Sequence, residues 1–172
     1  EDARPTERAC IAALRCHRAI AEMNQKWIQD GKPALPTRFG VHVGSTVVGN
    51  IGSSDRMNYT IIGDSVNFAA RLEAVNKRYG TWILVSDSVV EAVGHLFLTR
   101  PVDIVAVKGK VEGIGIHELI ATRSGPLSAT TEQLDLCART EKAFNHYLSR
   151  RWDEALTILN PISEQKPDDM VI

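Results

Sequence analysis

Apolar residues recur at steps of three and four through the N-terminal part of the chain. This spacing places them on one face of a helix and predicts a helix over residues 6–30. Gly31 and Pro33 follow and predict its end. The residues of the predicted apolar face are Ala9, Ile11, Ala12, Ala13, Leu14, Ala19, Ile20, Met23 and Trp27.

Apolar residues alternate with polar or small ones in several of the segments that follow, as they do in half-buried strands. Between these segments, two stretches return to helical spacing. The order of helix, strand hairpin, helix, strand, helix and strands predicts an α+β fold, with helices over one mostly antiparallel sheet. The predicted strands are 39–44, 46–51, 58–62, 81–85, 97–107 and 114–120, and the predicted helices are 64–78 and 86–93.

The C-terminal part of the chain is organised differently. A polar stretch predicts a linker, and helical spacing returns over residues 131–150 and 152–164. Residues 143–156 resemble one tetratricopeptide unit. A single unit cannot bury its apolar face alone, so we expect it to pack on the main domain, on a partner, or on further repeats. The predicted divisions are a main domain at 1–121, a linker at 122–130 and a tetratricopeptide-like helical hairpin at 131–172.

The composition is that of an ordinary globular protein, with 44% apolar and 24% charged residues among 172. The 20 basic and 21 acidic residues give a formal charge of -1, which provides no general attraction to nucleic acid. No apolar run approaches the roughly 18 residues that span a bilayer, and the polar N-terminus is unlike a signal peptide. We therefore expect a cytoplasmic protein, or the cytoplasmic part of a longer, membrane-attached one.

The three cysteines, Cys10, Cys16 and Cys137, lack the spacing of a zinc site and are odd in number. Cys10 and Cys16 lie among alanine and isoleucine at near-helical spacing, so we expect both to be small core residues. Thiols of this kind fit a reducing, cytoplasmic environment.

A strand end, a glycine and a helix start follow one another in a pattern that favours anion binding. Gly63 turns the chain and Asp64 begins the helix, in which Asn67 and Arg71 share one face. Asn67 falls near the positive end of the helix dipole, and arginine offers a planar fork of donors to phosphate oxygens. The alternative interpretation of this spacing is a solvated polar face, on which Arg71 pairs with Glu73 or Asp64.

Three motifs together resemble the catalytic domain of class III adenylyl and guanylyl cyclases. They read Gly-Asp-x-Val-Asn-x-Ala-x-Arg-Leu-Glu at 63–73, Arg-Phe-Gly-Val-His-Val-Gly at 38–44 and Val-Lys-Gly-Lys at 107–110. They stand in the family's order, and the resemblance covers residues 1–121. It implies a ferredoxin-like palm domain that lacks its first strands, followed by the C-terminal helical hairpin.

The resemblance implies a role for each matching residue. Asn67 matches the asparagine that orients the substrate ribose, and Arg71 matches the arginine that stabilises charge at the reacting phosphate. Lys108 matches the lysine that contacts the terminal phosphates. Thr60 matches the position that reads the purine edge, and a threonine there resembles the subgroup that includes bicarbonate-responsive enzymes. For His42, inside the second motif, we expect structural packing.

The resemblance also implies two divalent ions, Mg²⁺ or Mn²⁺, held by two aspartates. Both aspartates would precede Glu1, and none of Asp55, Asp64, Asp87 and Asp103 lies in a matching motif. We therefore expect no metal ligand in this chain and no activity from it alone. Class III cyclases work as head-to-tail homodimers with each active site shared across the interface, which we expect here as well.

The function that we expect is that of an adenylate cyclase in signal transduction, converting ATP to 3′,5′-cyclic AMP and pyrophosphate within a longer dimeric protein. One alternative is a guanylate cyclase, which Thr60 disfavours only mildly. A second is a catalytically silent cyclase-like module for regulation or dimerisation. A third is a protein-interaction module, which would bind a partner through Phe144, Tyr147 and Trp152 of the hairpin.

Overall fold

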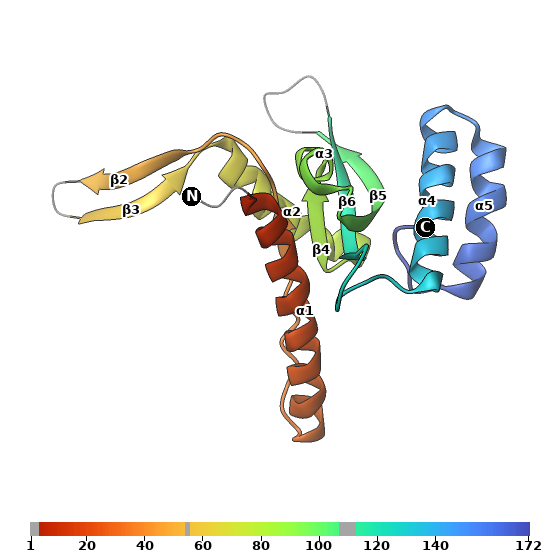
Figure 1. The fold of residues 1–172 in the computed structure, drawn as a ribbon, viewed down its shortest axis with the longest axis horizontal. Coiled ribbons are helices and arrows are strands. Elements are labelled where there is room, and N and C mark those ends of the chain that lie inside the picture. The colour runs from red at the N-terminus through yellow and green to blue at the C-terminus, as the bar shows by residue number, and fades with distance from the viewer. Residues whose placement is uncertain (1–3, 54–55, 107–112) are drawn as a thin grey trace.

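The computed structural model describes residues 4–53, 56–106 and 113–172 (Figure 1). Its helices and strands follow the predicted order, with ends that differ by a few residues. The described helices are α1 (Pro5–Gln29), α2 (Asp64–Tyr79), α3 (Asp87–Val93), α4 (Thr131–Leu148) and α5 (Trp152–Gln165). The described strands are β1 (Phe39–Val41), β2 (Val47–Ser53), β3 (Arg56–Ile62), β4 (Ile83–Ser86), β5 (Phe97–Val105) and β6 (Ile114–Thr122).

The central sheet has the strand order β1-β4-β6-β5. β1 runs parallel to β4, with Phe39 opposite Ile83, whereas β6 runs antiparallel to both β4 and β5. The sheet is therefore mixed but mostly antiparallel, as predicted, with β1 and β5 as its edge strands.

β2 and β3 do not join this sheet, so the prediction of a single sheet is wrong. They pair antiparallel with each other, from Val47 opposite Ile62 to Ser53 opposite Arg56, and project from the body (Figure 1). Every residue of β3 is exposed, so the arm, as we call β2 and β3, packs under no helix layer. Alternation along a sequence specifies a strand, but packing decides which sheet the strand joins.

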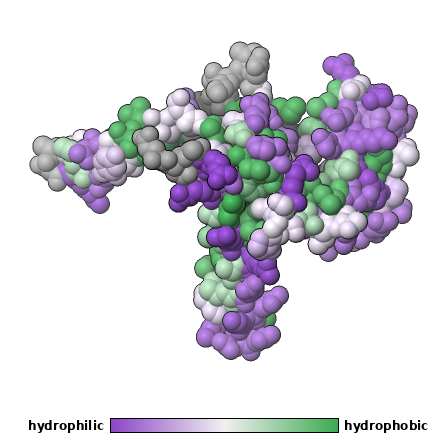
Figure 2. Space-filling model, in the orientation of Figure 1, coloured by the Kyte–Doolittle hydropathy of each residue, from purple (hydrophilic) through white to green (hydrophobic). Residues whose placement is uncertain are grey.

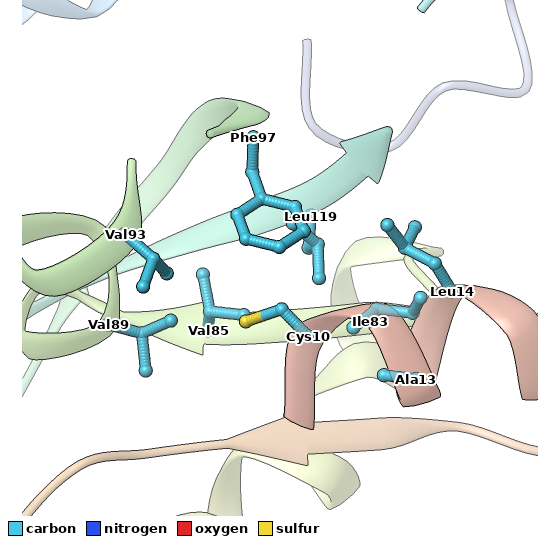
Figure 3. Packing of buried hydrophobic residues seen from close by; sticks show 9 residues of the cluster. All are labelled: Cys10, Ala13, Leu14, Ile83, Val85, Val89, Val93, Phe97 and Leu119. Atoms are coloured by element: carbon cyan, nitrogen blue, oxygen red, sulfur yellow. The ribbon is translucent and has the colours of Figure 1, made fainter. Parts of the chain in front are cut away.

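Two apolar cores lie on opposite faces of the central sheet. In β4, Ile83 and Val85 face one core, while Leu84 between them faces the other. The first core joins the sheet to α1 and α3 (Figure 3). The second joins it to α2 and comprises Phe68, Leu72, Leu84, Val102 and Ile116. Each fully buried side chain of this size contributes about 1.5–3 kcal/mol, so α2 is firmly fixed to the sheet.

Only the N-terminal turns of α1 pack on the sheet, and the rest of the helix extends beyond it (Figure 1). Cys10 is a core residue, as predicted, and burial raises the pKa of its thiol to about 11. Cys16 is exposed, so the prediction that it lies in the core is wrong. It follows buried Leu14 by two positions and therefore points to the other side of the helix.

The C-terminal hairpin packs on the main domain, which is the first of the three arrangements expected for it. Leu98 of β5, Ala121 of β6 and Cys137 of α4 form a shared apolar cluster. α4 begins with a reciprocal cap, in which the Thr130 side chain accepts from the backbone nitrogen of Gln133 and the Gln133 side chain accepts from Thr130. None of the described helices is long and apolar enough to cross a membrane.

Candidate active site

The helix α2 carries Asn67 and Arg71 on one face, as the spacing predicted, and this face points outward. Gly63 precedes the helix with a φ of 144°, and its carbonyl accepts a hydrogen bond of 3.3 Å from the backbone nitrogen of Asn67. Phe68 and Leu72 are buried against the sheet. Because Asn67 and Arg71 each precede a buried residue by one position, both lie beside the buried stripe and are exposed.

Asn76 fixes the position of α2 along the sheet. Its side chain is fully buried, and its Nδ2 donates to the carbonyl oxygens of Phe39 in β1 and Leu72 in α2, each at 2.9 Å. Its Oδ1 accepts a hydrogen bond of 2.9 Å from the hydroxyl of Thr81. A satisfied polar group in a core sets one register between helix and strand. Sequence reasoning missed Asn76, although its position four residues after Leu72 places it in the apolar stripe.

Arg71 connects α2 to the end of β5. Its Nη1 donates a hydrogen bond of 3.3 Å to the carbonyl oxygen of Ala106. Among the described residues the guanidinium makes this contact rather than an ion pair with Asp64 or Glu73, which was the alternative interpretation. Ala106 precedes Lys108 by two positions, although Lys108 itself lies outside the described residues. The structure thus places Arg71 beside Ala106, the last described residue before the segment that holds Lys108 in the sequence.

Thr60 lies on the arm, away from the central sheet. It is exposed and stands opposite Gly49 of β2. Only two further residues of β3 separate Thr60 from Gly63, which immediately precedes α2. The structure therefore links the predicted purine-reading residue to the helix of Asn67 through a short, extended segment.

A polar hollow of about 570 Å³ lies at the start of α2 and α3. Its lining includes the carboxylates of Asp64, Asp87 and Glu91, which repel the phosphates of a nucleotide. Asp87 accepts hydrogen bonds of 2.7 Å from the backbone nitrogen of Gly115 and from Nε2 of His117. The acidic lining of this hollow therefore disfavours the binding of phosphate groups.

The described residues do not fit a two-metal site. In the chain outside positions 1–3, 54–55 and 107–112, no group of three or more His, Cys, Asp and Glu side chains is placed to hold a metal. Asp103 accepts a hydrogen bond from the hydroxyl of Tyr79, and Asp87 is engaged as described above. Asp55 lies outside the described residues. No catalytic step through a metal follows from these side chains.

His42 has the structural role expected for it. Its Nδ1 lies 2.8 Å from the hydroxyl oxygen of Ser86, and its ring meets Phe68 edge-on, with 4.9 Å between the ring centroids. The histidine therefore joins β1, β4 and α2 at the sheet face that carries the candidate site.

Residues 4–120 match the family model of the adenylate and guanylate cyclase catalytic domain. The chain belongs to this family. The match contains the helix of Asn67 and Arg71, the arm with Thr60 and the segment with Lys108.

Known cyclases resemble the chain over most of its length. It is 39% identical over 119 residues to adenylate cyclase 1 of Rhizobium meliloti (strain 1021), which covers 69% of the chain and 18% of that protein. It is 30% identical over 164 residues to the terminal-differentiation specific adenylate cyclase of Dictyostelium discoideum. That match covers 94% of the chain and 8% of that protein, so it extends into the helical hairpin. The chain thus spans less than a quarter of either relative.

Solved cyclase structures share the fold. The adenylyl cyclase CyaB from P. aeruginosa superposes with a TM-score of 0.54 at 28% identity, covering 66% of this chain and 56% of that chain. The guanylyl cyclase Cya2 superposes with a TM-score of 0.57 at 30% identity, covering 73% and 63%. The α+β cyclase fold predicted from the motifs is confirmed.

Proposed function

We propose that this chain supplies the nucleotide-orienting and charge-stabilising residues of an adenylate cyclase, which converts ATP to 3′,5′-cyclic AMP and pyrophosphate. The observation that carries the proposal is the hydrogen bond from Arg71 to Ala106. It brings the arginine of α2 to Ala106, two positions before Lys108 in the sequence, and we assign both cationic side chains to one triphosphate. The names of the similar cyclases support the same reaction class.

Arg71 acts on the charge that develops during the reaction. The ribose 3′-hydroxyl attacks the α-phosphate, the new P–O bond closes the ring, and the bond to pyrophosphate breaks. Negative charge grows on the phosphoryl oxygens, where a fixed guanidinium stabilises the transition state more than the ground state. Asn67 lies one turn earlier on the same exposed face and orients the ribose, and Lys108 holds the terminal phosphates.

Thr60 is the residue that we assign to nucleotide choice. Its hydroxyl accepts a hydrogen bond from the amino group of adenine, which favours ATP. A threonine here also leads us to propose the bicarbonate-responsive subgroup, for which added bicarbonate should raise the turnover rate. A guanylate cyclase is the second candidate, because the structure of a guanylyl cyclase superposes at 30% identity.

We place the two divalent ions, Mg²⁺ or Mn²⁺, on aspartates that precede this chain in the complete protein. Family members generally use such ions, and the described residues contain no group of three or more His, Cys, Asp and Glu side chains placed to hold one. Held there, such ions would supply Lewis-acid activation of the attacking hydroxyl and would neutralise phosphate charge. The reaction belongs in the cytoplasm, where the free thiols of Cys10, Cys16 and Cys137 stay reduced.

The arm supports a head-to-tail homodimer. Apolar side chains are exposed on it in numbers that a monomer rarely presents to water. Hydrophobic surface gathers where the arm meets the body (Figure 2). We propose that this surface packs against a second copy, so that Asn67 and Arg71 complete a site whose metal-binding acids belong to the partner. The exposed residues are Val47, Val48, Met57, Tyr59, Ile61 and Ile62.

The test of this function is the activity of the full-length protein with Mn²⁺ and either ATP or GTP. Cyclic AMP from ATP supports the proposal, and cyclic GTP as the main product would establish the guanylate alternative. A Thr60→Val variant should lose preference for ATP over GTP, whereas Thr46→Val, on the adjoining loop, should not. A folded, dimeric protein that cyclises neither nucleotide would identify a silent regulatory module instead.

We further propose that the tetratricopeptide-like hairpin binds a protein partner that presents the apolar face of a helix. A groove of about 390 Å³ lies between the hairpin and β5, lined by Phe144, Leu159 and neighbouring side chains. Tyr147, Trp152 and Leu156 line it while each stays about half exposed, which leaves apolar surface for a helix to cover.

A photo-cross-linking amino acid at position 152 of the full-length protein tests this partner. One defined adduct should form from position 152, disappear on Tyr147→Ser, and be absent when the cross-linker stands at Glu154, which does not line the groove. Equal adducts from both positions, or adducts only with a second copy, would refute the partner.

A further inference from the structure

Arg100 of the central sheet binds the C-terminal segment through Asp169. It is 6% exposed in β5, and its Nε donates to a carboxylate oxygen of Glu118 in β6 at 2.7 Å. Its Nη1 and Nη2 donate to the two carboxylate oxygens of Asp169 at 2.6 and 2.9 Å. Two parallel hydrogen bonds between a guanidinium and a carboxylate fix the orientation of both side chains. The carboxylates more than offset the effect of burial and raise the pKa of Arg100.

Asp169 also shapes the turn that follows it. Its Oδ1 accepts a hydrogen bond of 3.2 Å from the backbone nitrogen of Val171. Its backbone carbonyl oxygen accepts a hydrogen bond of 3.4 Å from the backbone nitrogen of Ile172. The same carboxylate therefore accepts hydrogen bonds both from Arg100 and from the backbone of its own turn.

The turn packs against the end of α2. Val171 joins the apolar core that contains Phe68 and Leu72, the buried stripe beside the candidate catalytic residues. The side chain of Met170 covers Gly80, where α2 ends with a φ of 65°, and its sulfur lies 3.3 Å from the position of a Cβ there. A turn that begins at Asp169, 90 positions after Tyr79 at the end of α2, thus packs against that helix.

We propose that Asp169 and Val171 are positioning residues for catalysis, which hold α2 in place from the C-terminal segment. Arg100, paired with Asp169, anchors the turn, and the turn contacts the core under α2 and Gly80, the residue that caps the helix. This inference rests on the proposed function, because the residues that it positions are Asn67 and Arg71. Through these contacts, the turn that follows the C-terminal hairpin would affect the position of the helix that carries the candidate site.

The test uses the full-length protein with Asp169→Asn, which removes the charge that Arg100 binds. The matched control is Asp168→Asn, the same change at an exposed neighbouring residue. Val171→Ala is the second variant, because it removes only apolar contact and should fold if Asp169→Asn does not. Each is measured for kcat and KM with ATP and for amide hydrogen exchange across α2.

We expect Asp169→Asn and Val171→Ala to lower kcat about threefold or more, the effect typical of residues in a coupling network, with little change in KM. Amide exchange in the last turns of α2 should accelerate in both variants and stay at the parent rate in Asp168→Asn. Parent-like exchange and kcat in both variants would overturn the proposal. If the parent protein cyclises no nucleotide, the proposed function fails, and faster exchange would still establish the connection to α2.

Discussion

The guanidinium of Arg71 donates to the carbonyl oxygen of Ala106, 35 positions later in the sequence. This contact joins α2, which lies over one face of the central sheet, to the end of its edge strand β5. Arg71 is exposed and yet hydrogen-bonded to a backbone carbonyl, so its charge points in a defined direction, as the proposed role requires. Preorganised donors of this kind cost no reorganisation during the reaction.

Replacing Arg71 with alanine should lower the kcat of the full-length protein about a hundredfold, as expected for one lost transition-state donor. The control is Arg78→Ala on the same helix, where the guanidinium lies over the ring of Tyr79 at 5.4 Å. Rates of cyclic AMP formation at saturating ATP measure both variants. If both variants lowered kcat equally and only slightly, Arg71 would have no role in stabilising the transition state.

Because the apolar side chains of the arm are exposed, we expect dimerisation to depend on them. Tyr59 is 77% exposed, and Tyr59→Ser should weaken the dimer about tenfold or more if the ring is buried in the interface. Asn58→Ser, on the opposite side of the same strand, should leave the dissociation constant unchanged. Sedimentation equilibrium of the full-length protein compares the two. A dimer that tolerates Tyr59→Ser would place the interface elsewhere.

Gly40 allows β1 to lie against α2. A Cβ at this position would lie 2.5 Å from the backbone nitrogen of Glu73 and closer still to the carbonyl oxygen of Ala69. Gly40→Ala should therefore lower the free energy of unfolding by about 1–3 kcal/mol, because backbone must shift to admit the methyl group. Gly49→Ala, where no atom lies within 4 Å, should be close to neutral. Urea unfolding curves measure both, and equal midpoints would contradict the packing described here.

The phenol of Tyr79 should ionise at a higher pH than an exposed tyrosine. Burial, together with the hydrogen bond to Asp103 and its charge, raises the pKa of the Tyr79 phenol to about 12, against the opposing effect of Arg78. The stabilisation from this raised pKa is complete below the unfolded value of about 10 and is lost as the pH rises through about 12. The difference in phenolate absorbance between the parent and Tyr79→Phe should follow this late ionisation. A midpoint near 10 would show that Tyr79 lacks this environment.

The sequence predicted most of the local structure correctly. Helical spacing located α1 and α2, and alternation located the strands, because these patterns depend on which side of an element is buried. It failed where a helix was only partly covered. Cys16 shares the composition of the buried turns of α1, and only the position of the sheet shows that it is exposed.

The candidate site divides in the same way. The resemblance of the motifs predicted roles for Asn67, Arg71, Thr60 and Lys108, which stay predictions, and helical geometry placed the first two on one face. The partners that fix the site remained hidden. Arg71 meets Ala106 and Asn76 meets Phe39 across 35 and 37 positions, distances over which no sequence pattern specifies contact.

By itself, the sequence determined the elements, the family motifs and the outward face of α2, because each depends on residues within one or two turns of each other. The tertiary structure alone decided that β2 and β3 leave the central sheet as an arm. It also decided that Asp169 accepts hydrogen bonds from Arg100, 69 positions earlier in the sequence. Such contacts arise from the packing of distant segments, where burial selects one arrangement among many that the local pattern permits.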